Sequence, residues 1–278
     1  MTSFASPLTR VVLVFFSFVA LTAGTLAVSA QTISDINKAN GFHESLMSIR
    51  PNIANATKSI PMPLSKKFEE AWSDAVQGSF DADKMEAAIE SRMAGNLTEK
   101  DLSDLASFYA SPLGKRVTAL EIQASTPEER KRKKIDGPKI LAELQTKDPA
   151  RLELYRKIME DLSSVDMGEA IALNVAYAMT AGMLGAAGKP LKDEQIMGLV
   201  KQQAAKLRET IEKNVMEGSA YTYRDLPLDE LRLYSAFLLS PAGSRYYDQM
   251  LAAMAVVMGD EARSFGHRFF VALGYRKA

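Results

Sequence analysis

One twenty-residue stretch occurs twice in this chain and sets how the rest can fold. Residues 97–116 read LTEKDLSDLASFYASPLGKR and residues 226–245 read LPLDELRLYSAFLLSPAGSR, so a constant offset of 129 aligns them without a gap. The identical positions are Leu97/Leu226, Leu102/Leu231, Phe108/Phe237, Ser111/Ser240, Pro112/Pro241, Gly114/Gly243 and Arg116/Arg245. Such a repeat indicates one structural unit used twice, and it carries no His, Cys or catalytic constellation of its own.

Each copy predicts a helix, a sharp turn and a second helix. Proline disfavours helix at the residue before it but suits the first helical position, and serine is a good helix cap. Ser111-Pro112 and Ser240-Pro241 are therefore stop-and-restart signals. We call the resulting helix–turn–helix geometry an elbow, and we expect both serines to cap helices rather than to act as nucleophiles.

Gly114 and Gly243 follow two residues after each proline. A glycine has no side chain to hold two helix backbones apart, so the spacing predicts close backbone approach at each elbow. Replacing either glycine by Leu or Val is expected to overpack the elbow and to cost about 1–3 kcal/mol.

Arg116 and Arg245 recur in the second turn after the elbows. Because a helix start offers free N–H groups and partial positive charge, these cations could hold an anion or a partner's carboxylate. The alternative, which we favour, is an ion pair to an acid on the preceding helix. The acids in question are Asp101 or Asp104 in the first copy and Asp229 or Glu230 in the second.

Apolar residues elsewhere recur at helical spacing, without strand alternation, so the sequence predicts an all-α fold. We expect a first helix within residues 33–50 and an amphipathic helix over 192–217. The uncharged residues 170–188 are expected to form the central buried helix of the second half, with small residues allowing close packing. The chain after Pro241 predicts one long helix or two helices broken near Gly259.

A basic run, Arg130 to Lys134, follows a capping box and a helix-starting proline. Five consecutive cations could bind phosphate or anionic head groups. Because the chain is neutral overall and the run has no interleaved aromatics, we favour a solvated helix face, interrupted at Gly137-Pro138.

The repeat divides the chain into two related halves. Asp148-Pro149 again combines a cap with a proline, and we place the boundary there. The prediction is a first helical repeat domain over residues 31–148 and a second over 149–278. Both would be built on an elbow and packed as one body.

Residues 1–30 have the three parts of a secretory signal peptide. Arg10 precedes an apolar run over residues 11–23, and small residues end at Val28-Ser29-Ala30. We expect cleavage after Ala30, a periplasmic location, and no stable membrane span in the mature chain. The chain has 34 Lys+Arg, 34 Asp+Glu and no Cys. Such a balance of charges gives no net electrostatic field that would attract nucleic acid. Without cysteine no disulfide can form, so the core alone must hold the fold.

The pattern Leu-x5-Phe-x2-Ser-Pro-x-Gly-x-Arg behind a signal peptide resembles the bacterial exported family named domain of unknown function 2059. The resemblance is better in the first copy, where Phe108-Tyr109 precedes Ala-Ser-Pro, than in the second, where Leu238 stands in place of the tyrosine. It implies a helical, periplasmic protein and adds no catalytic residue.

The sequence offers little for catalysis. His43 and His267 are the only histidines, and Met47 stands where a zinc-binding helix would carry its second histidine. We expect no metal and no cofactor. The favoured hypothesis is a non-enzymatic binding or envelope-maintenance module, with an envelope protein or an apolar small ligand as partner. The alternative is a hydrolase-like enzyme with fold-assembled carboxylates and Arg116 or Arg245 binding an anionic substrate.

Overall fold

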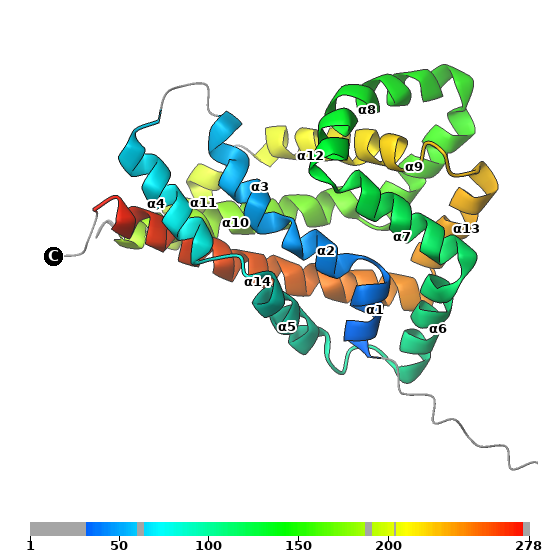
Figure 1. The fold of residues 1–278 in the computed structure, drawn as a ribbon, viewed down its shortest axis with the longest axis horizontal. Coiled ribbons are helices and arrows are strands. Elements are labelled where there is room, and N and C mark those ends of the chain that lie inside the picture. The colour runs from blue at the N-terminus through cyan, green and yellow to red at the C-terminus, as the bar shows by residue number, and fades with distance from the viewer. Residues whose placement is uncertain (1–31, 60–63, 187–190, 203, 275–278) are drawn as a thin grey trace, which may run out of the picture. The chain divides into compact units, whose positions relative to one another are not determined.

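The computed structural model describes residues 32–59, 64–186, 191–202 and 204–274. The predicted signal peptide and the cleavage after Ala30 lie outside these residues. Within the described ranges all regular structure is helical, which confirms the all-α prediction (Figure 1). No described helix combines the length and the apolar character that crossing a membrane requires.

The helices follow one another with short connections. They are α1 (Ile33–Ala39), α2 (Phe42–Met47), α3 (Ile49–Ala56), the 3-10 helix η1 (Thr57–Ser59), α4 (Lys66–Gln77), α5 (Ala82–Met93), α6 (Glu99–Ala110), α7 (Pro112–Ala124), α8 (Pro127–Lys147), α9 (Pro149–Asp161), α10 (Ser164–Ala186), α11 (Asp193–Lys201), α12 (Ala204–Thr222), α13 (Leu228–Leu238) and α14 (Pro241–Ala272).

Two expected helices are divided in the structure. The segment 33–50 is not one helix, because Gly41 takes a positive φ of 77° between α1 and α2, a conformation that suits glycine and ends a helix. The predicted helix over 192–217 is also wrong in extent. Its residues belong to α11 and α12, which are separate elements.

The predicted interruption at Gly137-Pro138 does not occur, because α8 continues through Pro138. Proline removes one helical hydrogen bond, and Lys134, whose carbonyl would have accepted it, is exposed to water. The glycine at position 137 lets this part of α8 approach α12 closely. A Cβ at this position would lie 2.8 Å from the carbonyl oxygen of Glu217 on α12.

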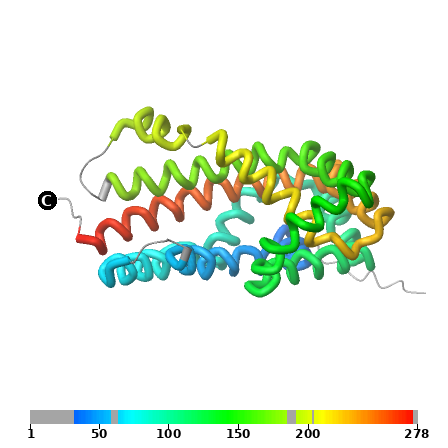
Figure 2. Tube along the Cα trace, turned by 90° about the horizontal axis from the view of Figure 1, so that it is seen from above, coloured from blue at the N-terminus to red at the C-terminus, as the bar shows by residue number. Residues whose placement is uncertain are grey.

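The most extensive helix pair is α10 with α14 (Figure 2). Of the two alternatives for the chain after Pro241, one long helix is correct, since α14 does not break at Gly259. The uncharged segment is helical to Ala186, but it is less buried than expected: most side chains between 171 and 184 are half-buried, and Ala178 and Gly182 are buried. α10 packs on α14 and, less extensively, on α9, α11 and α12, so most of its side chains stay partly exposed.

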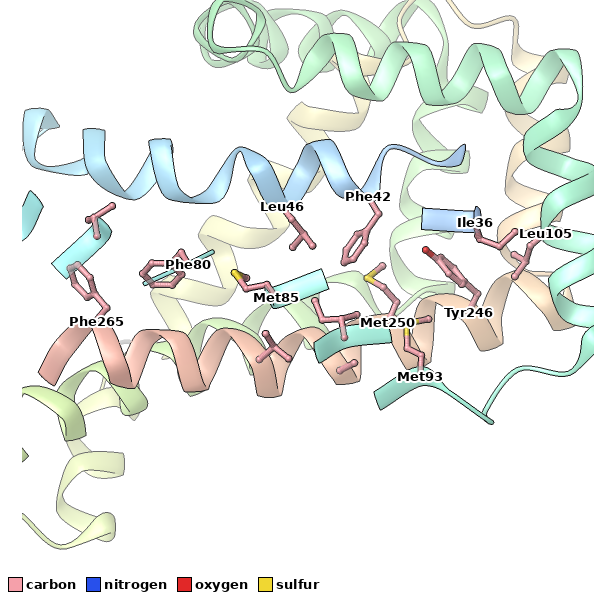
Figure 3. Packing of buried hydrophobic residues seen from close by; sticks show 14 of the residues in the cluster. Ile36, Phe42, Leu46, Phe80, Met85, Met93, Leu105, Tyr246, Met250 and Phe265 are labelled. Atoms are coloured by element: carbon pink, nitrogen blue, oxygen red, sulfur yellow. The ribbon is translucent and has the colours of Figure 1, made fainter. Parts of the chain in front are cut away.

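The buried apolar side chains form two clusters. The first joins α1, α2, α4, α5 and α6 to α14, and Figure 3 shows part of it, with Tyr246 and Phe265 of α14 facing residues of the N-terminal helices. The second draws its buried residues from α7, α9, α10, α12 and α13, with the start of α13 preceded by Leu226. The first elbow therefore leads from α6 in the first cluster to α7 in the second. The second elbow leads back, from α13 in the second cluster to α14 in the first.

Candidate functional site

The two elbows have matching local geometry. Ser111 Oγ accepts the Gly114 N–H at 3.0 Å, and Ser240 Oγ accepts the Gly243 N–H at 3.1 Å. Pro112 and Pro241 are the first helical residues of α7 and α14. Each serine hydroxyl therefore satisfies a backbone donor that the helix start leaves free, which is a structural task.

The elbow glycines leave no room for a side chain. A Cβ on Gly114 would lie 2.1 Å from the Phe108 carbonyl oxygen, and one on Gly243 would lie 2.2 Å from that of Phe237. Both neighbours are backbone atoms at the end of the preceding helix, so they cannot rotate away. The close backbone approach is therefore between the two helices of the same elbow.

The elbow arginines pair across the repeat. Arg116 Nη1 donates to both carboxylate oxygens of Glu230 at 2.8 and 2.7 Å. Arg245 Nη1 donates to Asp101 Oδ2 at 2.5 Å. The expectation of a pair with the preceding helix was wrong, although two of the expected acids are used. The offset of 129 maps Asp101 onto Glu230, so the two ion pairs are equivalent and exchange partners between the copies.

The repeated phenylalanines meet between the elbows. The rings of Phe108 and Phe237 are stacked, with centroids 3.5 Å apart and planes 6° from parallel. Residue i of one copy contacts the same residue of the other, while Arg116 and Arg245 each contact the acid of the opposite copy. The residues of the two sequence copies therefore make reciprocal contacts with each other.

A cavity beside the elbows contains the most distinctive side chain in the described residues. Glu121 lies on α7, beyond the first elbow, and faces a cavity of about 270 Å³. Tyr155 of α9, Tyr223 after α12, Tyr234 of α13 and Tyr247 of α14 also line it. Its other lining residues are mostly apolar: Ile158, Met159, Leu162, Val215 and Leu238, with Ser164 and Ser219.

Two tyrosines hold one oxygen of this carboxyl group. The hydroxyls of Tyr223 and Tyr234 donate to Glu121 Oε1 at 2.5 and 2.7 Å. Among the described residues, no side chain or backbone N–H donates to Oε2. Glu121 is half-buried because it meets the cavity, and the surrounding protein supplies it with no basic partner.

Burial raises the pKa of Glu121 above its ordinary value of 4.5, although the two tyrosine hydroxyls act in the opposite direction. Burial also raises the pKa of Tyr223 and of Tyr234 well above 10, and the neighbouring Glu121 charge adds to both shifts. A protonated carboxyl can accept both hydroxyls on its carbonyl oxygen. The cavity therefore favours a neutral Glu121 between neutral tyrosines.

We expect Glu121→Gln to stabilise the protein as the pH rises. Folding raises the pKa of Glu121, so the stability it contributes is full below its pKa in the unfolded chain and is lost as pH rises through the folded pKa. Glutamine keeps an acceptor for Tyr223 and Tyr234 but cannot ionise. The variant should gain about 1.4 kcal/mol over wild type for each unit of pKa elevation.

Urea denaturation across a pH series measures this gain. Glu128→Gln, at an exposed position of α8, is the control and should track wild type. If the Glu121→Gln and wild-type curves stay parallel at every pH, burial does not raise the pKa of this carboxyl.

A second cavity of about 270 Å³ adjoins the first. The two share Glu121, Val215, Ser219 and Tyr223, and Lys133 lines only the second. Burial lowers the pKa of Lys133, with help from the charge of Arg130. The other cations of the basic run are exposed or paired: Arg132 with Glu129 at 2.7 Å, and Arg130 with Asn52.

Other polar groups lie apart from this cavity. His43 Nδ1 lies 2.6 Å from Glu86 Oε2, and that hydrogen bond raises the pKa of His43. His267 lines a different, more open cavity of about 920 Å³ with Arg263 and Arg268. No group of three or more His, Asp or Glu side chains in the described ranges is arranged to hold a metal ion.

The sequence did not predict the Glu121 site. Ser111, Pro112, Gly114 and Arg116, with their counterparts in the second copy, build the elbows and do not line the cavity. The only signal in the sequence was the density of tyrosines between 221 and 247. Glu121 itself stands in an ordinary helical context, and its two tyrosine partners, Tyr223 and Tyr234, lie more than 100 positions further along the chain.

Fold and site together define a helical protein with two matching elbows beside a tyrosine-lined cavity. Residues 83–128 match the model of the family described as "Uncharacterized protein conserved in bacteria (DUF2059)". The resemblance to this family is confirmed for the segment that holds the first motif copy and Glu121. Neither the curated proteins nor the solved structures contain a match to the chain.

Proposed function

We propose that this chain is an exported binding protein, active in the periplasm as a non-enzymatic or envelope-maintenance module, that takes a small ligand into the Glu121 cavity. The observation that carries the proposal is a cavity with mostly apolar walls and one polar end, formed by Glu121 and its partners Tyr223 and Tyr234. Binding sites for small molecules have this composition, with a few convergent polar groups that fix orientation. Residues 1–30 support export through their signal-peptide pattern.

The cavity size supports a small ligand. Its volume of about 270 Å³ is just below the range of about 300–1,000 Å³ typical of pockets for drug-sized molecules. The raised pKa of Glu121 adds support, because side chains with perturbed pKa values gather at functional sites.

The hydrolase-like alternative has less support. Its substrate-binding residues, Arg116 and Arg245, are paired with Glu230 and Asp101 and do not line the cavity. Glu121 is the single carboxylate among the residues that line it, whereas paired acid–base catalysis needs two titratable groups within reach of one substrate.

We also propose that residues 31–148 and 149–278 are related halves. The helix after each elbow, α7 or α14, packs against helices of the other half. The crossed pairs Arg116–Glu230 and Arg245–Asp101 support this, as does the Phe108–Phe237 stack. On this proposal α14 corresponds to α7 and α8 joined. The cap and proline at Thr126-Pro127, which separate α7 from α8, are replaced in the second half by Ala255-Val256.

The test of the binding proposal uses benzyl alcohol, a neutral probe with an apolar body and one hydrogen-bonding group. Calorimetry and saturation-transfer NMR should detect its binding to the wild-type mature chain. Ser219, which lines both cavities, provides a matched pair of variants. Ser219→Leu should fill the cavity and abolish binding, whereas Ser219→Ala should retain it. No binding to wild type, or equal binding to folded Ser219→Leu, would contradict the proposal.

A further inference from the structure

The Glu121 cavity has an acidic side chain in its lining but no basic one. Its lining includes one carboxyl group and no Lys, Arg or His. Arg151, which donates to Tyr155 of the lining, is otherwise directed elsewhere: it donates to the carbonyls of Tyr223 and Leu226 at 3.0 and 2.8 Å, and it pairs with Asp148. Lys133 lines the adjoining cavity and not this one. An anionic ligand would therefore meet only a negative or neutral wall.

The hydroxyls of the lining tyrosines have protein partners, which leaves their rings as the part available to contact a ligand. Tyr223 and Tyr234 donate to Glu121. Tyr155 receives a hydrogen bond from Arg151 at 3.5 Å, and the hydroxyl of Tyr247 lies 2.9 Å from that of Tyr109. The rings are close to one another, with centroids 6.4 Å apart for Tyr155 and Tyr223 and 5.9 Å for Tyr223 and Tyr234.

Aromatic rings grouped in this way attract organic cations. The face of a tyrosine ring is electron-rich, and several rings around one site form the aromatic cage that binds ammonium groups. Glu121 adds a carboxylate whose Oε2 has no hydrogen-bond donor from the described protein. Ring faces and a free carboxylate oxygen both favour the same ligand charge.

We infer that the cavity is a site for a small organic monocation, an ammonium group on a short apolar body, with Glu121 as its counter-ion and the four tyrosines as its cage. The ammonium lies at Oε2. The apolar body lies against Met159, Leu162 and Leu238. This inference rests on the proposed binding function.

Binding of such a ligand is linked to the release of a proton from Glu121. The groups that face Glu121 are neutral tyrosines: Tyr223 after α12, Tyr234 of α13, and Tyr109 and Tyr247, of α6 and α14, whose own titration responds to its charge. Lys133 of α8 lines the adjoining cavity. Burial raises the pKa of Glu121, and no cation among the residues of its own cavity offsets that shift. A bound ammonium lowers that pKa, so at a pH where the carboxyl group of the free protein is protonated, uptake of the ligand releases a proton to the solvent.

Benzylamine and benzyl alcohol test the inference, because they have the same apolar body and differ in charge. At a pH where titration shows Glu121 to be protonated in the free protein, wild type should bind benzylamine at least about tenfold more tightly than benzyl alcohol. Calorimetry in two buffers of different ionisation enthalpy should show release of one proton with the amine and none with the alcohol.

Glu121→Gln separates the inference from the proposed function. The variant keeps an acceptor for Tyr223 and Tyr234, and the ratio of its affinities for the two probes should no longer favour benzylamine. Equal affinities for both probes in wild type, or an unchanged preference in folded Glu121→Gln, would overturn the inference and leave the binding function in place. If wild type binds neither probe, both proposals fail. The proton count in wild type does not depend on the variant.

Discussion

Replacing Gly114 or Gly243 by alanine is expected to lower the free energy of unfolding by about 3 kcal/mol, the upper end of the usual cost of overpacking. A single methyl group is enough, because its carbon would lie 2.1 or 2.2 Å from a backbone carbonyl oxygen. The serine caps and the crossed ion pairs depend on the same turn. Relief of the clash therefore requires movement of the whole elbow.

Chemical denaturation of the two alanine variants measures this cost. Gly198→Ala is a matched control within α11, since no atom lies within 4 Å of its added Cβ. Alanine there should be neutral or stabilising by up to about 1 kcal/mol. Elbow variants as stable as the control would mean that the chain turns at these residues in another way.

Gly266→Ala should have an effect of similar size, about 3 kcal/mol, at the contact between α10 and α14. A Cβ on Gly266 would lie 2.3 Å from the carbonyl oxygen of Met179. The contact is reciprocal, because a Cβ on Gly182 would lie 2.2 Å from that of Arg263. Each helix backbone thus rests against a glycine of the other.

The double variant Gly182→Ala/Gly266→Ala distinguishes this contact from two independent clashes. Once one methyl group has separated the helices, the second should cost much less, so the double variant should lose less stability than the two single variants together. Strict additivity in urea denaturation would contradict a shared helix contact.

Local signals in the sequence predicted local structure well. Ser111-Pro112 and Ser240-Pro241 encode their turns in adjacent residues, so each elbow forms where the sequence placed it. The first helix was predicted wrongly because Gly41 was not recognised as a left-handed break. Pro138 was given too much weight, since a helix tolerates a proline where the freed carbonyl faces water.

Long-range arrangement left no such signal. Arg116 pairs with Glu230 and not with Asp101 because α7 enters the cluster that contains α13. Nothing beside either arginine encodes that exchange. The Glu121 site is hidden for the same reason, because Tyr155, Tyr223 and Tyr234 approach the carboxyl group only after the helices pack.

The protonation of Glu121 connects the stability, the ligand and the proton release in this account. It can be followed directly by carbon-detected NMR of the Glu121 side-chain carboxyl in protein labelled at glutamate, through a pH titration with and without benzylamine. We predict that the free protein titrates above the ordinary value of 4.5 and that saturating amine keeps the carboxylate ionised to lower pH. A resonance that titrates at the ordinary value and ignores the amine would contradict the account.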